Sequence, residues 1–266
     1  MKKYMYSFAG EVTITICRIR PALAAAMLAG LLSAVPVLAA DTGVDFGHPN
    51  NDVSNIGSLQ RGAKIFVNYC MGCHSAKYVR YNRLASDLDI TEDQLVNNLM
   101  FLGGRPFDTM QNAMPAADAE RWFGVSPPDL SLIARSRGTD FLWAFMKSFY
   151  IDESRPTGVN NLALANAAMP HVLWELQGMQ RAIYDERTNE DGSSEMVFTG
   201  FEVMTPGSLS AAEYDQLVRD LVNFLEYIGE PIQLERRRLG VWVLVFLFVF
   251  GLFAYALKNE IWTDIK

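Results

Sequence analysis

The stretch Cys70-Met71-Gly72-Cys73-His74 decides how the rest of the chain folds. Two Cys residues at i and i+3, followed at once by His, form the pattern by which c-type haem is attached. Two thiols one helical turn apart can bond to the two vinyl groups of one haem, and the adjacent imidazole then lies where it can bind iron. The motif therefore predicts one covalent haem c, held by Cys70 and Cys73, with His74 as an iron ligand.

A Cys-x-x-Cys pair has two other uses, in zinc sites and in redox disulfides. Zinc needs two further ligands, and outside the N-terminal segment described below only His48 and His171 remain. A redox disulfide of the thioredoxin type requires a βαβ context, which the sequence lacks. Haem is the interpretation that the motif favours.

The second axial ligand is expected to be Met, because electron-transfer cytochromes c commonly pair His with Met. Met114 and Met169 both precede a Pro in expected loops. Met169 is favoured, because its loop precedes the last helix of the domain, where the chain can fold over the open face of the haem. Most other Met residues fill cores, which makes the remaining candidates weaker: Met100, Met110, Met146, Met179, Met196 and Met204.

Two His residues outside the motif are also possible ligands. His171 lies two residues from Met169 and could compete for the iron. We expect it instead on the surface of the loop. His48 lies in an irregular lead-in over residues 41–57 and belongs to no motif.

The first 40 residues are typical of a secretory signal. Two Lys and two Arg residues precede an Ala- and Leu-rich stretch over 21–38, and small residues near 39/40 suit cleavage. An uncleaved anchor helix is the alternative. Cleavage would remove Cys17 and leave the two Cys residues of the haem motif as the mature domain's only thiols.

A second apolar run lies near the C-terminus. Residues 239–257 contain 19 residues and no charge. As a helix this run spans roughly 28 Å, about the hydrocarbon thickness of a bilayer. Arg236, Arg237 and Arg238 flank one end, and Trp262 suits the headgroup layer beyond the other. The run predicts a single-pass anchor.

These ends divide the chain into a signal peptide over 1–40, an exported domain over 41–234, an anchor over 235–258 and a cytoplasmic tail over 259–266. The three arginines alone would place the domain in the cytoplasm, but a translocated domain largely overrides local charge. We therefore expect the domain on the periplasmic side of a bacterial inner membrane. It holds 14 Lys and Arg against 26 Asp and Glu. This net charge of −12 disfavours nucleic acid and favours basic soluble partners.

Helical periodicity predicts helices over 59–69, 91–101, 130–133 and 139–149, and a last helix opening at Ser210. Residues 91–94 and 210–213 fit capping boxes. Loops are expected over 103–128 and 155–170, with a short strand or hairpin over 193–204. Long loops are usually functional or wrapped around something. The predicted fold is mainly α: a class I cytochrome c-like domain with long loops around one haem, plus one C-terminal transmembrane helix.

Several further segments carry a resemblance to a known family. They are His74-Ser75 with the run over 78–84, Pro127-Pro128-Asp129-Leu130-Ser131, Arg135 and Arg137, Pro156-Thr157-Gly158-Val159, Ala168-Met169-Pro170, and the tail from Glu230-Pro231 to Trp262. Together they resemble cytochrome c1, the c-type haem subunit of the cytochrome bc1 complex, over roughly residues 58–266. One departure is Trp122-Phe123-Gly124-Val125, which stands where an Asn- and Gly-rich run is expected.

The resemblance implies roles for individual residues. His74 and Met169 would be the axial ligands, and Cys70 and Cys73 the thioether residues. Pro128 would border the haem, and Arg137 would face a haem propionate, which a guanidinium can bind in bidentate fashion. Without the resemblance, Arg137 reads as a solvated cation at a helix end.

The resemblance also implies a function. The chain would take electrons from a Rieske iron–sulfur protein and pass them to a soluble or tethered cytochrome c, with its anchor beside a cytochrome b. No catalytic site of its own is expected, because its role would be that of a redox subunit of a quinol–cytochrome c reductase.

Three alternatives remain. A membrane-tethered shuttle or oxidase subunit would need a flexible linker, whereas the connection over 230–239 is short and charged. An open-site haem enzyme or sensor would bind carbon monoxide quickly. A Cys-x-x-Cys protein without haem would fail a haem stain.

Overall fold

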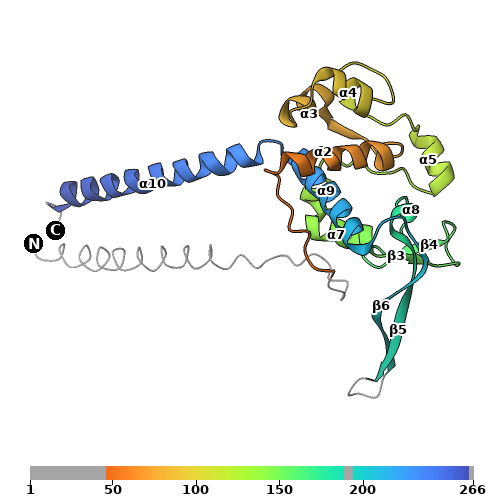
Figure 1. Ribbon diagram of the computed structural model, residues 1–266. Helices are drawn as coiled ribbons and strands as arrows, with labels where there is room; N and C mark the ends of the chain where they lie inside the picture. The colour runs from red at the N-terminus through yellow and green to blue at the C-terminus, as the bar shows by residue number, and fades with distance from the viewer. Residues whose placement is uncertain (1–45, 189–193, 264–266) are drawn as a thin grey trace, which may run out of the picture. The chain divides into compact units, whose positions relative to one another are not determined.

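The computed structural model describes residues 46–188 and 194–263. The predicted signal peptide and its cleavage site lie outside these residues. Helices dominate the described chain (Figure 1), as the sequence predicts, and they are α2 (Ile56–Ile65), the π-helical turn η1 (Phe66–Cys70), α3 (Tyr81–Asp87), α4 (Glu92–Leu99), α5 (Ala116–Phe123), α6 (Ile133–Arg137), α7 (Thr139–Lys147), α8 (Trp174–Gln177), α9 (Ala211–Gly229) and α10 (Gln233–Ile261).

Within the described ranges the strands form three antiparallel pairs. These are β1 (Ala76–Arg80) with β2 (Thr109–Met110), β3 (Phe149–Ile151) with β4 (Val159–Asn161), and β5 (Gly178–Thr188) with β6 (Ser194–Pro206). The first two pairs are short and lie beside the segments that carry the predicted haem residues. They fix the ends of loops and do not form a separate layer.

The helix that leads into the Cys motif changes its pitch just before the first Cys. The side chain of Asn55 accepts a hydrogen bond from the Ser58 N–H at 3.0 Å and begins α2. The last turn is η1, in which the Met71 N–H reaches the Phe66 carbonyl at 2.9 Å. Single π-turns inside α-helices are frequent at functional sites. The helix predicted over 59–69 is therefore present, and its wider last turn carries Cys70.

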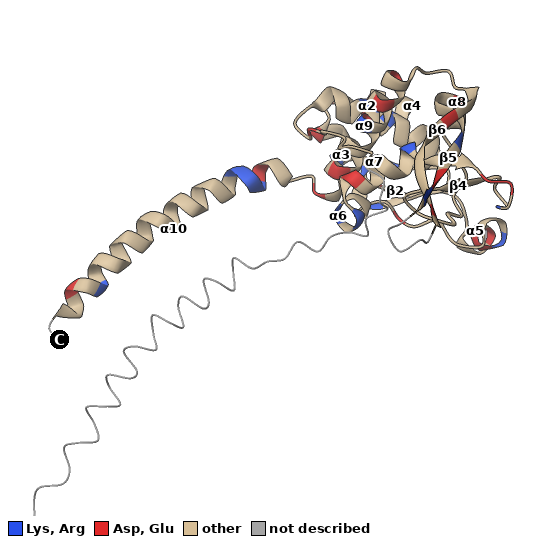
Figure 2. Cartoon of the chain, turned by 90° about the horizontal axis from the view of Figure 1, so that it is seen from below, with Lys and Arg blue, Asp and Glu red and all other residues tan. Residues whose placement is uncertain are grey.

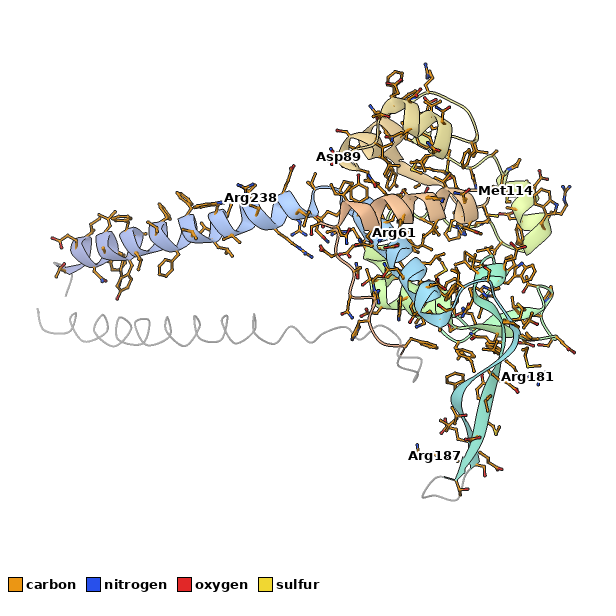
Figure 3. All side chains as sticks on the ribbon, viewed as in Figure 1. Arg61, Asp89, Met114, Arg181, Arg187 and Arg238 are labelled. Atoms are coloured by element: carbon orange, nitrogen blue, oxygen red, sulfur yellow. The ribbon has the colours of Figure 1, made fainter. Side chains whose placement is uncertain are left out.

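Helix α9 packs across α2 and closes the core. A Cβ atom at Gly62 of α2 would overlap the carbonyl group of Asp220, so the two helices can approach this closely only at glycine. Beside this contact the ring centroids of Phe66 and Phe224 lie 5.5 Å apart. The Asp220 carboxylate is buried and accepts hydrogen bonds from Arg61 and Ser58 of α2. Figure 3 labels Arg61 at this crossing. The crossing fixes the helix that presents the haem motif.

Two predicted helix starts are confirmed in detail. Thr91 and Gln94 form a complete capping box before α4. Ser210 and Glu213 do the same before α9. The predicted loop over 103–128 was wrong in part, because it contains β2 and α5. Helix α5 ends at Gly124, whose φ of 75° permits the left-handed turn that stops it.

Other boundaries also differ from the sequence prediction. The helix expected over 130–133 instead begins at Ile133, and the loop expected over 155–170 contains β4. The hairpin expected over 193–204 is much longer, because β5 supplies a full partner strand (Figure 1). Cross-strand side chains stabilise it: Tyr184 and Phe198 pair edge to face, with ring centroids 5.9 Å apart. Figure 3 shows Arg181 and Arg187 along this hairpin.

Helix α10 contains the apolar run that the sequence predicts as a membrane anchor. Among the described residues it is the one helix that is long and apolar enough to cross a membrane. Figure 2 marks charged residues near both ends of this helix and none along the stretch between them. The helix extends past the predicted apolar run in both directions.

The connection before the anchor is held by charge. Glu230 lies between Arg135 of α6, at 2.5 Å, and Arg236 in the first turn of α10. These two guanidinium groups lower the pKa of Glu230 to about 2. The short connection before α10 thus carries two ion pairs on one carboxylate.

Candidate functional site

One apolar pocket brings the predicted site residues together. Its cavity volume is about 260 Å³. Its walls include every predicted haem residue: Cys70, Cys73, His74, Pro128, Arg137 and Met169. Most other lining residues are apolar and come from five further parts of the chain: Phe123 and Val125, Leu130 and Ile133, Phe141, Leu142, Phe145 and Met146, Leu164, Ala167 and Ala168, and Leu225.

The two Cys residues lie at the end of η1 and in the turn that follows. Both are free thiols, with Cys70 buried and Cys73 half-buried. Burial raises the pKa of Cys70 to about 12, with a further contribution from Cys73, and it also raises the pKa of Cys73. The N–H of His74 donates to the Cys70 carbonyl at 2.8 Å, which closes the turn. Both thiols line the same pocket as the His74 ring.

The imidazole of His74 is oriented by a backbone carbonyl. Its Nδ1 lies 2.8 Å from the Pro128 oxygen, an acceptor that requires the proton on Nδ1. The other ring nitrogen, Nε2, then keeps its lone pair for a metal. Burial lowers the pKa of His74, while the bond to Pro128 and the charge of Asp129 oppose this. The ring is therefore neutral near pH 7, as an iron ligand must be.

A side chain that the sequence did not single out clamps the motif from the other side. Asn112 follows β2, and its amide donates to the carbonyl of Cys73. Its backbone N–H donates to the Ser75 hydroxyl at 3.0 Å, and that hydroxyl donates to the amide oxygen at 3.0 Å. The two residues flanking His74 are thus both bound to Asn112. No local pattern marks this residue, because its partners lie nearly 40 positions earlier.

Met169 lines the pocket from the loop after β4. It is partly buried and packs against the hydrophobic core. The loop is shaped by Asn161, which is 1% exposed and whose amide donates to the Phe145 carbonyl at 2.7 Å. Its oxygen accepts the N–H groups of Ala163 and Leu164 at 2.9 and 3.1 Å. The run Gly158-Val159-Asn160-Asn161 could have indicated a loop held by Asn side chains, but this signal was not used.

The other Met candidates are separated by position. Met114 is not among the pocket-lining residues, and Figure 3 shows it in the connection before α5. Met146 does line the pocket, from α7, and is buried. The pocket therefore holds two thioethers, one on a helix and one on a loop.

The expectation that His171 lies on the surface was wrong. It is 6% exposed, and its ring stacks on Phe149 at 4.9 Å with an angle of 8° between the planes. Burial lowers its pKa to about 4, so the ring is neutral and packs as an aromatic. It is not among the pocket-lining residues. His48 also lies elsewhere, with its side chain 72% exposed and 3.0 Å from Asp140.

A cation lies at the edge of the pocket. Arg137, in the last turn of α6, is exposed, and its guanidinium carbon lies 5.5 Å from the centre of the Phe141 ring. This contact holds the side chain while its N–H groups stay available to a carboxylate. The segment Trp122-Phe123-Gly124-Val125, which departs from the family pattern and spans the end of α5, also contributes to the site, because Phe123 and Val125 line the pocket.

These features fit a haem. The pocket offers an apolar lining for a porphyrin, two thiols for its vinyl groups, a neutral imidazole and thioethers for iron, and a guanidinium for a propionate. In the part of the chain that the structure describes, no group of three or more His, Cys, Asp or Glu residues could hold a bare metal ion. The donor set therefore suits iron that brings its own ring of nitrogen ligands.

Comparison with known proteins gives a consistent result. The family described as the Cytochrome C1 family matches residues 51–101 and 202–265. A cytochrome c1 of Allochromatium vinosum is 48% identical over 235 residues, which cover 88% of this chain and 96% of the relative. A protein of Nitrosomonas europaea named ammonia monooxygenase gamma subunit is 46% identical, over 78% of this chain and 83% of its own. A cytochrome c1 of Rhodospirillum rubrum is 29% identical over 78% and 82%.

Proposed function

This chain belongs to the cytochrome c1 family and carries one covalently bound haem c, and on that premise we propose that Cys70 and Cys73 hold the haem while His74 and Met169 bind its iron. The chain is the haem-carrying electron-transfer subunit of a bc1 complex. When bound, the haem supplies an iron centre that takes up and releases one electron. The observation that carries the residue assignment is the Nδ1 bond from His74 to Pro128, in one pocket with both thiols and Met169.

Each pocket residue then has a physical task. Cys70 and Cys73 retain the cofactor in an exported protein through two carbon–sulfur bonds. His74 would offer its Nε2 lone pair to the iron, and Met169 would offer a thioether, a ligand type that raises the reduction potential. The apolar walls exclude water from the ring. Arg137 neutralises a propionate at the edge of the pocket.

The family supports a proposal for the partners, and the predicted signal segment supports a proposal for the orientation. We propose a Rieske iron–sulfur protein as the electron donor, a soluble or tethered cytochrome c as the acceptor, and a cytochrome b beside α10. The haem domain lies on the periplasmic side of the bacterial inner membrane, with α10 as its single-pass anchor and a short cytoplasmic tail. The net charge of −12 over residues 41–234 supports a basic acceptor.

The assembly is tested by purification. Detergent-extracted membranes are passed over an affinity resin that binds a tag on this chain, with an untagged strain as the control. Co-purification of a cytochrome b and a Rieske protein, with quinol-dependent reduction of cytochrome c, is the expected result. Recovery of monooxygenase subunits, in line with the name of the Nitrosomonas europaea relative, or of oxidase subunits would overturn the assignment of partners.

The acceptor is tested through ionic strength. Reduction of a basic cytochrome c by the purified complex is expected to slow as salt rises, because screening weakens attraction between opposite charges. A rate that does not depend on salt would argue against an acidic docking face.

Protease added to spheroplasts tests the orientation, since a periplasmic haem domain is cleaved before the membrane is broken.

A further inference from the structure

Three Asp-x-Ser turns in the described residues share one local geometry and differ in one respect. In each, the Asp carboxylate accepts the backbone N–H of the Ser two positions later: Ser54 to Asp52 at 2.9 Å, Ser131 to Asp129 at 2.9 Å, and Ser154 to Asp152 at 3.0 Å. In the first and third turns, the Ser hydroxyl donates to the same carboxylate oxygen, at 2.7 and 2.6 Å. Among the described hydrogen bonds the Asp52 carboxylate binds only Ser54, whereas the Asp152 carboxylate also accepts from the Asn160 side chain at 2.9 Å.

The turn at Asp129 differs, because both its carboxylate and its Ser hydroxyl bind β1. The second oxygen of Asp129 accepts the backbone N–H of Lys77 at 2.9 Å. The hydroxyl of Ser131 accepts the backbone N–H of Tyr78 at 3.1 Å. Both donors belong to β1, which begins two residues after His74. We call residues 127–131 the strap, because this segment is tied across β1.

The strap needs this carboxylate because of its prolines. Pro127 and Pro128 have no N–H, so the first half of the strap cannot donate to β1. Its own backbone donor to this region is Leu130, whose N–H reaches the Ser75 carbonyl at 2.8 Å. Between the prolines and Leu130, the Asp129 side chain is the group that fastens the strap to β1. The carbonyl next to it in the chain is that of Pro128, which accepts from Nδ1 of His74.

We infer that Asp129 is a positioning residue for His74. Its carboxylate fixes the strap on β1 and so directs the Pro128 carbonyl at the imidazole. The hydrogen bond on Nδ1 makes the ring a stronger donor to a metal at Nε2. A stronger donor favours ferric over ferrous iron, so a well-placed carbonyl keeps the reduction potential lower than a poorly placed one. This inference rests on the proposed axial role of His74.

Two explanations of an effect at this position have to be separated. The negative charge of Asp129 near the haem would itself favour ferric iron, without any role for its hydrogen bonds. Asp129→Glu keeps the charge but moves the carboxylate by one methylene, out of register with the Lys77 and Ser131 N–H groups. Asp129→Ala removes both charge and acceptors. Asp52→Ala removes the same kind of carboxylate at a turn where it binds only Ser54 among the described hydrogen bonds, and is the matched control.

The experiment uses the full haem-loaded chain in detergent. A redox titration measures the potential, and proton NMR measures how fast the His74 Nδ1 proton exchanges with water. For Asp129→Ala we expect the equilibrium constant for reduction to rise about threefold to tenfold, which is an upward shift of about 30–60 mV at 59 mV per tenfold. The Nδ1 proton should exchange at least about tenfold faster. Asp129→Glu should follow Ala, and Asp52→Ala should match the wild type.

The outcomes are distinct. If Asp129→Ala matches Asp52→Ala in both measurements, the inference is wrong. If Asp129→Glu keeps wild-type values while Ala does not, charge and not placement is responsible, and the inference is again wrong. Should the Ala variant fail to load haem, Asp129→Asn, which retains one acceptor oxygen, must shift the potential upward by less than Asp129→Glu does. A wild-type haem spectrum without His/Met ligation would instead contradict the proposed assignment of His74 and Met169 as iron ligands, whatever the variants show.

Discussion

The two walls of the pocket are built differently. On the wall that carries His74, hydrogen bonds reach the ligand itself and its neighbours: Pro128 accepts from its ring, and Asn112 binds Cys73 and Ser75. On the wall that carries Met169, the hydrogen bonds concentrate at Asn160 and Asn161, well before the ligand. Met169 itself is placed by packing against the core.

This difference indicates which iron ligand has a fixed orientation and which one depends on the packing around it. A ligand fixed by its own hydrogen bonds keeps its orientation when surrounding packing changes, because such bonds are directional. A thioether fixed by packing depends on the volume of its neighbours. We expect changes on the His74 wall to alter whether haem is bound and how strongly the imidazole donates. Changes on the Met169 wall should alter the potential and the access of small ligands.

The largest effect is expected for Cys70→Ala combined with Cys73→Ala. This variant removes both carbon–sulfur bonds, so haem staining after denaturing electrophoresis should disappear completely. Cys17→Ala is the control and should stain as the wild type does, because Cys17 lies in the predicted signal segment. Persistent staining of the double variant would contradict the assignment of the His74 wall.

Replacing the ligand of the other wall should leave haem attached and change its chemistry. Met169→Leu is expected to lower the reduction potential by about 100 mV or more, within the roughly 0.8 V range that axial ligands span. Ferrous haem should then bind carbon monoxide. Met114→Leu, outside the pocket, and Met146→Leu, inside it, are the controls. An unchanged potential in the Met169 variant, or an equal fall in the Met146 variant, would break the comparison.

The asparagines test how each wall is supported. Asn161→Ala leaves buried backbone groups without partners and should lower the free energy of unfolding by about 2–3 kcal/mol. Asn112→Ala, at a more open position, should lower it by about 1 kcal/mol. Denaturant titrations of the haem-loaded variants measure both. Carbon monoxide binding should increase with the Asn161 variant alone, and equal increases in both would show that the walls are not independent.

Glu230 lies outside both walls of the pocket, and replacing it is expected to have the smallest effect of these variants. Its folded pKa of about 2 lies below the ordinary value of 4.5, because Arg236 and Arg135 stabilise the carboxylate. The folded state therefore gains stability from Glu230 above about pH 4.5, and this gain is lost as pH falls toward 2. Unfolding midpoints of Glu230→Gln should be less sensitive to pH over this range than those of the wild type. Its haem spectrum should be unchanged at neutral pH, and a changed spectrum would show coupling through α6.

The sequence predicted the features that depend on neighbours along the chain. The haem motif and the capping boxes at Thr91 and Ser210 are local, and the boxes form as expected. Features that depend on distant partners were not predictable from spacing. The side chains of Asn112 and Asn161 donate hydrogen bonds to backbone carbonyls of other segments. The ring of His171 is buried and stacks on the ring of Phe149.

The division into signal, domain, anchor and tail remains a prediction, as do the individual haem residues. The pocket nevertheless gathers those residues from four separate segments of the chain. Sequence periodicity cannot predict such long-range contacts, because it reports only the secondary structure of each segment. The family motifs supplied that information.

The π-turn before Cys70 has a consequence for the length of the chain. An α-helix advances about 100° per residue, and a π-turn accommodates one residue more than an α-turn would. Removing a single residue from 66–69 would let α2 continue with regular pitch and would leave the first thiol pointing in nearly the same direction, whereas regular α pitch with every residue kept would turn it roughly a quarter-turn around the helix axis. The π-turn therefore absorbs one extra residue without changing the direction of Cys70, and a one-residue deletion there should leave haem attachment possible, whereas a one-residue insertion should abolish it although every haem-binding side chain is still encoded.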